Sequence, residues 1–430
     1  MKIVLDWMLI IISTAMVMIS IKDILKKKIC AMDFCIIIFY IFNCFPILLD
    51  HIIGKPVYNT WFYGFNNAMQ NEDVGVMYDV YMLISIIIFM FYKVLKNGKS
   101  KTSIISKTNE CKGTYKKILI LITILPHLYI VLTGNISNFM QYKSLAQRNL
   151  GEASVNIINL LNQFSIVAFS YLYFCASNVK TNKLILILYS LSICWIDGKR
   201  YMVVTILLLY AFLYTNSEKF KTISYRKMLK YTIVGITLLS IFYINYTNNK
   251  MKTVYSTKES EISFYTDFRI NFGRDDVVKF VIMKEFIEKE PILEYKGQSV
   301  LSSVFMFVPR SIWANKPYPH YRYLSAAIYN ESVDTIPSGM TPSIFDMGIA
   351  NFSYLGIIIT PIIMAIICSI TDNTKRNIEK GIYVIMISNL LTQSLDAAIG
   401  YILILILIFL YKILTKKGKK SEKFIQEDYQ

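Results

Sequence analysis

Charged side chains are scarce in this sequence: Asp, Glu, Lys and Arg make up 17% of its 430 residues, whereas about a quarter of an ordinary soluble domain is charged. Hydrophobic residues reach 54% and aromatic residues 14%, with a mean hydropathy of +0.44. This composition excludes a disordered chain, a collagen-like chain and a typical cytosolic enzyme. It predicts an all-α protein that crosses a membrane many times.

Several chemical motifs are also missing. The sequence contains no GxGxxG, GxxxxGK[ST], HExxH or CxxC pattern, and only 3 His, so nucleotide-driven chemistry and a helical zinc site have no support. Most of the 7 Cys lie in or beside apolar runs, which favours buried hydrophobic cysteines over a disulfide framework. No Asp-rich cluster of the kind that Mg²⁺ needs is present. We therefore expect neither a cofactor nor a metal ion.

Long apolar runs are what the sequence does contain, and they predict about eleven transmembrane helices, within a range of about ten to twelve. The predicted spans are 3–21, 29–49, 76–92, 118–134, 157–177, 184–196, 201–215, 231–247, 352–370, 381–395 and 397–414. No internal repeat is evident, which argues against a transporter built from inverted halves.

The distribution of Lys and Arg orients these spans. One set of short loops carries 28 basic residues and the opposite set carries 6, so the Lys-rich loops are predicted to be cytoplasmic. This divides the chain into helices one to eight (1–247), one large exterior segment (248–351), helices nine to eleven (352–414) and a cytoplasmic tail (415–430). The net charge of +17 then needs no nucleic acid to explain it.

The exterior segment has the features of a folded region. Asp275 and Asp276 precede a helical apolar pattern, as acidic residues at a helix N-terminus do. The apolar stretch 299–309 is too short to span a bilayer and predicts an interfacial or re-entrant piece, with Trp313 as an interface anchor. Loops of this length are usually functional or disordered, although an ordered cap without chemistry is the simpler alternative.

Two ionisable positions stand out beside the spans. The turn from Asp197 to Arg200 joins two short spans, which predicts a recessed position where ionisable residues usually have a partner or a task. A structural Asp197–Arg200 pair is the simpler interpretation, and Asp396 on the same side is either a second acidic group or a turn residue. His320 is the only histidine of the exterior segment, and is either a base or an ordinary loop residue.

Several local stretches resemble a known family. Gly198-Lys199-Arg200 opens a span; Gly297-Gln298-Ser299 is followed by Val308-Pro309-Arg310, Trp313 and Lys316-Pro317; and Asp346-Met347-Gly348 and the stretch from Phe352 to Gly356 lead into a later span. Together with many spans and one large exterior loop, these stretches resemble the Wzy-type polymerases of O-antigen and capsule repeat units. The matching stretches cover roughly 120 residues.

The resemblance implies a GT-C-like helical fold in the bacterial plasma (inner) membrane, with a metal-independent active site on the exterior face. Such enzymes transfer a growing glycan from undecaprenyl diphosphate onto a hydroxyl of the next lipid-linked repeat. The expected partners are undecaprenyl-diphosphate-linked oligosaccharide, membrane lipid, a chain-length regulator and a flippase.

The residues that this chemistry needs are present. Arginine binds phosphate in a bidentate way and stabilises a diphosphate leaving group, so Arg200 and Arg310 are the predicted diphosphate ligands. Arg269 or Arg274 would assist, and Arg322 would have a weaker effect. His320, Asp197 or Asp396 could act as the base. The further substrate-binding candidates are Lys316, Tyr318 and Tyr321.

Other functions stay open on the sequence alone. A ligase of the same fold would move finished glycan onto another acceptor, and a flippase would carry lipid-linked oligosaccharide across the membrane. A membrane acyltransferase and a purely structural membrane protein are further alternatives. The single large exterior segment argues against a flippase, which would have short loops on both sides.

Overall fold

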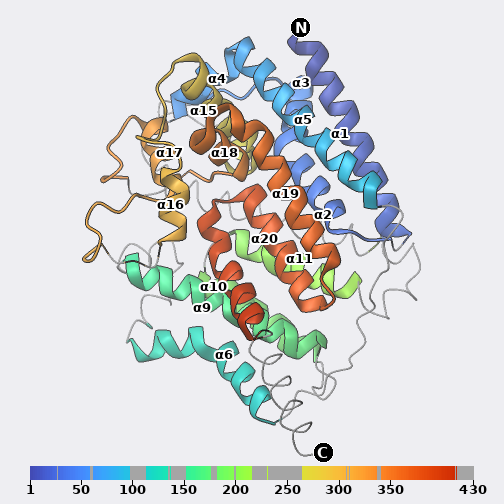
Figure 1. Cartoon of the computed structure of the whole chain (residues 1–430), viewed down its shortest axis with the longest axis vertical. Coiled ribbons are helices and arrows are strands. Elements are labelled where there is room, and N and C mark those ends of the chain that lie inside the picture. Colours follow the sequence, from blue (N-terminus) through green and yellow to red (C-terminus); the bar gives the residue numbers. More distant parts are fainter. Residues whose placement is uncertain are drawn as a thin grey trace, which may run out of the picture. The chain divides into compact units, whose positions relative to one another are not determined.

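The computed structural model describes residues 1–26, 28–58, 62–96, 113–133, 136, 152–175, 182–197, 200–215, 230, 264–306, 308, 310–336, 340–411 and 413. Every regular element in this part of the chain is helical. The prediction of an all-α protein is therefore confirmed for the described residues (Figure 1).

Six helices in the described ranges are long and apolar enough to cross a membrane: Lys2–Leu25, Ala31–Ile53, Glu72–Lys96, Gly113–Leu132, Asn156–Phe174 and Ile344–Asn373. Each overlaps a predicted span, and Ile344–Asn373 begins inside the segment that was predicted to be exterior. Four other predicted spans are shorter helices, at Lys183–Asp197, Arg200–Thr215, Asn377–Thr392 and Leu395–Tyr411. The predicted span 231–247 lies outside the described residues. The chain thus has the helices of a membrane protein, while the total of eleven stays a prediction.

The described helices fall into two compact units, Met1–Thr102 with Ser217–Ala365 and Ser103–Asn216 with Ile366–Gln430. Unit 1 contains α1 (Lys2–Leu25), α2 (Ala31–Phe39), η1 (Tyr40–Cys44), α3 (Phe45–Ile53), α4 (Tyr63–Gln70), α5 (Glu72–Lys96), α14 (Phe264–Phe272), α15 (Asp275–Ile282), η4 (Met283–Ile287), α16 (Gln298–Val304), α17 (His320–Tyr329), α18 (Ile344–Phe352), η5 (Ser353–Leu355) and the first part of α19 (Gly356–Asn373).

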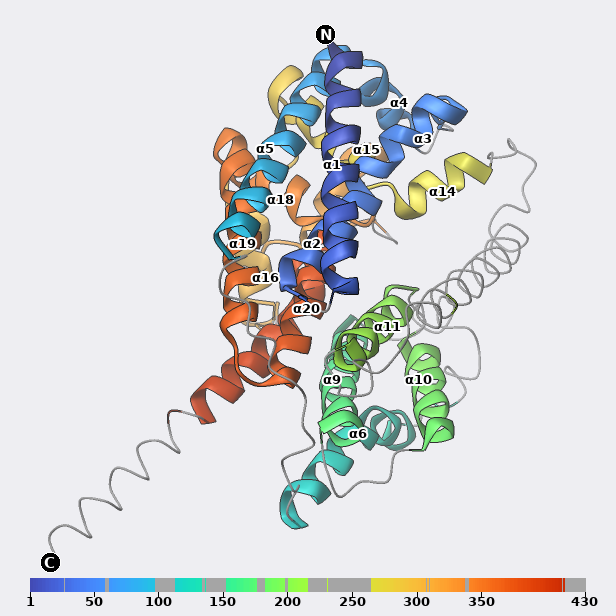
Figure 2. The same ribbon diagram turned by 90° about the vertical axis from the view of Figure 1, so that its right-hand side faces the viewer.

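Contacts between ionisable side chains link the three N-terminal spans of unit 1 at both ends. His51, at the end of α3, lies 3.2 Å from Asp6, near the start of α1. Lys93, near the end of α5, lies 2.9 Å from Asp23 at the other end of α1 and 2.7 Å from Asp33 at the start of α2. These contacts show that the span formed by α2, η1 and α3 runs opposite to α1 and α5. The helices α1 and α5 run in the same direction, and Figures 1 and 2 both show them side by side.

The helix α15 connects the predicted exterior segment to these N-terminal helices. All eight of its residues are buried, and it packs against α4, α5 and α18. Phe280 meets the ring of Phe65 edge-on at 5.9 Å, and a Cβ at Gly64 would lie 2.7 Å from the Phe280 ring, so glycine lets α4 approach. The helix begins at Asp275, as the sequence predicts. The described part of the exterior segment therefore packs into unit 1.

The last helix of unit 1 is broken near its start. Ser353 has a φ of 54°, which interrupts the run between α18 and α19. Two glycines make the break compact: a Cβ at Gly348 would lie 1.9 Å from the Thr360 hydroxyl oxygen, and one at Gly356 would lie 2.1 Å from the Gly348 carbonyl oxygen. The break sets α18 apart as a short buried helix, and α18 carries Asp346 in its first turn.

Unit 2 is a separate group of helices. It contains α6 (Gly113–Leu132), α9 (Glu152–Ser170), η3 (Tyr171–Cys175), α10 (Lys183–Asp197), α11 (Arg200–Thr215), α20 (Asn377–Thr392) and η6 (Leu395–Ala398), with the last part of α19. The Ser165 hydroxyl of α9 donates to the Thr123 carbonyl of α6 at 2.7 Å. A Cβ at Gly381 of α20 would lie 2.8 Å from the Leu209 side chain of α11, so glycine lets the two helices approach.

Two exposed positions test the predicted orientation. Glu290 follows η4 on the predicted exterior side, with its side chain 71% exposed, and Lys375 lies in an exposed turn on the predicted cytoplasmic side. With Glu290→Cys or Lys375→Cys in the full chain, we expect a membrane-impermeant thiol reagent to label intact cells at position 290 only, because Lys-rich loops stay inside. The parent chain is the control, and labelling at position 375 but not at 290 would reverse the orientation.

Candidate functional site

Two predicted arginines meet at one tyrosine in unit 1. The guanidinium carbon of Arg310 lies 3.9 Å from the centre of the Tyr318 ring, and that of Arg322 lies 4.9 Å from it. All three side chains are half-buried. A guanidinium within about 6 Å of an aromatic centre is attracted by the ring. We call Arg310, Tyr318 and Arg322 the arginine–tyrosine cluster.

The local sequence explains how this cluster is held. Prolines at 317 and 319 flank Tyr318 and restrict the backbone, and Pro319 precedes the first residue of α17. The Lys316 amine donates to the Met306 and Val308 carbonyls at 3.1 and 2.9 Å, and Arg310 donates to the Lys316 carbonyl at 2.7 Å. Lys316 therefore closes the loop that carries Arg310.

Charge within the cluster favours an anionic ligand. The Tyr318 hydroxyl donates to Asp334 at 2.5 Å. This hydrogen bond and partial burial raise the pKa of Tyr318, although Arg310 and Arg322 oppose the shift, so the phenol stays neutral near pH 7. The described residues offer Arg310 no ion pair; its contacts there are a carbonyl and a ring. Its forked donors suit the oxygens of a phosphate.

His320 lies two residues beyond Tyr318, at the start of α17. Its Nε2 is 2.9 Å from an oxygen of Asp346, and both side chains are fully buried. Its Nδ1 is buried without a hydrogen-bond partner in the described part of the chain. Tyr321 follows in the same turn and is half-buried. Six predicted site residues thus share one short stretch of unit 1: Arg310, Lys316, Tyr318, His320, Tyr321 and Arg322. Within this stretch the structure brings Arg310, Tyr318 and Arg322 into contact, whereas His320 contacts Asp346.

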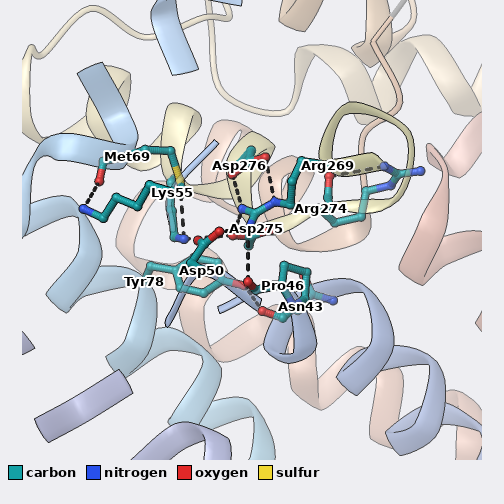
Figure 3. Close-up of polar contacts among 12 residues, drawn as sticks. Asn43, Pro46, Asp50, Lys55, Met69, Tyr78, Arg269, Arg274, Asp275 and Asp276 are labelled. Carbon is teal, nitrogen blue, oxygen red and sulfur yellow. Dashed lines mark hydrogen bonds and ion pairs between the residues drawn. The ribbon is translucent and has the colours of Figure 1, made fainter. Parts of the chain in front are cut away.

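Arg269 lies elsewhere in unit 1, enclosed by acidic residues from separate segments (Figure 3). Its guanidinium is 2.5 Å from Asp50 of α3, and 2.6 and 2.5 Å from Asp275 and Asp276 of α15. It also donates to the Pro46 carbonyl at 3.1 Å. The side chain is fully buried. Arg269 is therefore paired with carboxylates of the protein, which is a different environment from the diphosphate site predicted for it.

The charges around Arg269 form what we call the ion network: Asp50, Arg269, Asp275, Asp276 and Lys279. Lys279 lies 2.8 Å from Asp275. Burial raises the pKa of Asp276 to about 6, although Arg269 opposes the shift. Burial also opposes ionisation of Asp275, but Arg269 and Lys279 outweigh it and hold the pKa of that carboxyl below its ordinary value. Asp276 is therefore the carboxyl that takes up a proton more readily.

Arg274 is packed beside this network. Its side chain is buried, and its guanidinium carbon lies 5.6 Å from the centre of the Phe42 ring of η1. Its backbone N–H donates to the Phe42 carbonyl at 3.0 Å. Like Arg269, it ties the start of α15 to the N-terminal helices, and no described contact brings either residue to the arginine–tyrosine cluster.

The remaining predicted residues belong to unit 2. Asp197 ends α10, is fully buried and accepts a hydrogen bond from Asn162 at 3.2 Å. Arg200 begins α11, but its side chain lies outside the described residues, as does the turn at 198–199. The predicted Asp197–Arg200 pair therefore stays a prediction. Asp396 lies in η6.

The sequence alone does not reveal two acidic partners of the predicted site residues. Asp346 was seen only within a family-like stretch, although Ser343 followed by Asp346 three residues later is a capping-box pattern. That pattern predicts the start of α18 but not the contact with His320. Asp50 lies at the end of a span, and nothing in its local sequence points to Arg269. Among the described residues, no group of three or more His, Cys, Asp or Glu side chains could hold a metal ion.

In comparisons with known proteins, no family model, curated protein or solved structure matches this chain.

Proposed function

We propose that this protein is a membrane glycosyltransferase that polymerises lipid-linked repeat units of a surface polysaccharide. The growing glycan, held on undecaprenyl diphosphate, would be transferred onto a hydroxyl of the next lipid-linked repeat. The reaction would take place on the exterior face of the bacterial plasma membrane. A GT-C-like fold, and partners such as a flippase and a chain-length regulator, belong to the same proposal.

The arginine–tyrosine cluster is the observation that carries this proposal. A diphosphate leaving group gains negative charge as its bond to the sugar breaks, and donors already in place at that position lower the barrier most. Arg310 and Arg322 supply two permanently charged, forked donor groups within one short stretch of the chain. Their position on Tyr318 restricts their rotation, so less entropy is lost when phosphate oxygens bind.

The region around the cluster suits a lipid-linked substrate. Val304, Phe305 and Ile312 are 61%, 42% and 78% exposed, and Trp313 packs edge-on against Phe305 at 5.8 Å. Exposed apolar side chains next to cations are typical of a segment that lies in a membrane interface. This placement would put Arg310 at the level of a lipid diphosphate. It also keeps the interfacial role that the sequence predicts for 299–309.

A ligase of the same fold would use the same donor substrate and the same arginines, and it is the second candidate. Gel profiles of surface glycan from a deletion strain separate the two. We expect single repeat units to remain while the ladder of longer chains disappears, because only polymerisation is lost. Complementation with the intact gene is the control. Loss of all surface glycan would point to a ligase or a flippase instead.

A further inference from the structure

The contacts of His320 favour one of its two neutral tautomers. Asp346 accepts hydrogen bonds from the Ser343 backbone N–H at 2.5 Å and from the Ser343 hydroxyl at 2.7 Å, both on Oδ1. His320 Nε2 lies 2.9 Å from the other oxygen, Oδ2. Oδ1 already accepts twice, as a carboxylate does, and a carboxylate can only accept, which favours Nε2 as the donor. In the neutral imidazole, Nδ1 then carries the lone pair.

That lone pair is left unused. Nδ1 is buried, and none of the described residues donates a hydrogen bond to it. Leaving a buried polar atom unpaired costs free energy, and such atoms call for an explanation such as a catalytic role. Asp346 meets the ring only at the other nitrogen, Nε2. The same arrangement, an acceptor nitrogen oriented by a carboxylate on the other ring nitrogen, is found in general bases.

We propose that Asp346 is a positioning residue that fixes the tautomer of His320, so that Nδ1 takes the proton of the acceptor hydroxyl. This inference rests on the proposed function and assigns Asp346 a role that the sequence did not suggest. In the reaction, the hydroxyl oxygen forms a bond to the anomeric carbon of the growing glycan while its proton moves to Nδ1. The bond from that carbon to the diphosphate oxygen breaks, and the diphosphate leaves with the electron pair.

The surrounding structure holds this pair rigidly. Ser343 caps α18 and binds Asp346 in a reciprocal capping box. The Met340 N–H donates to the Ser325 hydroxyl of α17 at 2.6 Å, which ties the segment before α18 to the helix that carries His320. The Tyr81 hydroxyl of α5 donates to the Phe345 carbonyl at 3.3 Å. These bonds leave the imidazole and the carboxylate little freedom to separate.

The substitution Asp346→Asn tests the tautomer directly. The amide oxygen would have to accept from Ser343, because a backbone N–H is a donor. The amide NH₂ would then face Nε2, which must become the acceptor, and the proton would move to Nδ1. The side chain keeps its size and its helix cap, but the lone pair at Nδ1 is lost.

The experiment combines a spectrum with kinetics on the full-length protein in lipid. The chain has only 3 His, so nitrogen NMR of ¹⁵N-histidine-labelled protein can be assigned with one His320→Gln sample. We expect a protonated Nε2 and a bare Nδ1 in the wild type, and the reverse in Asp346→Asn. With lipid-linked repeat units as substrate, kcat should fall about a hundredfold or more, the range for a lost general base, while KM changes little.

Glu331→Gln, which removes an exposed carboxylate just after α17, is the matched control and should match the wild type in both measurements. A protonated Nδ1 in the wild-type protein would overturn the proposal without any variant, so it stays testable even if Asp346→Asn fails to fold. Wild-type kcat in a folded Asp346→Asn would overturn it as well. If the purified wild type elongates no lipid-linked repeat, the proposed function fails, and the spectrum still reports the tautomer.

Discussion

Alanine in place of both Arg310 and Arg322 should lower the rate of glycan polymerisation by about a hundredfold or more while the protein stays folded. Removing one donor that stabilises transition-state charge typically costs about 10²–10³ in rate. Both side chains are half-buried on the Tyr318 ring, so little packing is lost. We expect each single Ala variant to shorten the glycan ladder and the double variant to abolish it, with kcat measured on lipid-linked repeats.

Lysine at either position should restore only part of the rate, because it lacks the planar fork of arginine. Arg376→Ala is the control: this arginine lies before α20 with its side chain 58% exposed, and its loss should leave the ladder unchanged. The sequence predicts a weaker effect at Arg322 than at Arg310, whereas the shared ring predicts similar effects. Full-length ladders in both single variants, at matched membrane expression, would remove the arginine–tyrosine cluster from the proposed site.

Arg269→Ala should destabilise unit 1 by about 3–5 kcal/mol, the typical cost of breaking a buried ion pair by removing one partner. Arg269 and Lys279 are the cations of the ion network, facing Asp50, Asp275 and Asp276. Without Arg269, one buried cation would face three carboxylates. Since a folded domain is stable by only about 5–15 kcal/mol, we expect a large fall in melting temperature and in membrane abundance.

The double variant Arg269→Ala with Asp276→Asn separates charge imbalance from other effects. It removes one of the unpaired carboxylates, so we expect part of the lost melting temperature to return. Arg376→Ala again serves as the control. If Arg269→Ala keeps the wild-type melting temperature but loses activity, the structural role is contradicted. That result would support the predicted role of Arg269 in diphosphate binding.

The helices of this protein could be predicted because their causes are local. Apolar runs of about 20 residues predict the spans such as Glu72–Lys96 and Gly113–Leu132. Acidic residues before an apolar pattern predict that α15 begins at Asp275. Both signals depend on residues within a few turns of each other. The approximate place of the candidate site could also be predicted, because its aromatic, basic and histidine residues lie close together between 310 and 322.

The partners of the charged residues could not be predicted, because they come from distant segments. Arg269 was expected at a substrate, yet Asp50, from a different part of the chain, meets it in the fold. The contact between His320 and Asp346 crosses 26 positions and two helices. In both cases the sequence shows that an ionisable side chain is present, and only the packing of helices shows which group it contacts.

The distance along the chain between Asp50 and Arg269 has a consequence for biosynthesis. The two residues are 219 positions apart, and the contact between Tyr58 and Asp276 spans 218. At about 5–20 residues per second, a ribosome takes about 10–40 s to make the intervening chain. For that time Asp50 sits at the end of its span without its partner. The N-terminal helices can therefore reach their final packing only after the later residues have been made. A prematurely terminated chain would expose the unpaired Asp50 carboxylate to quality-control proteases.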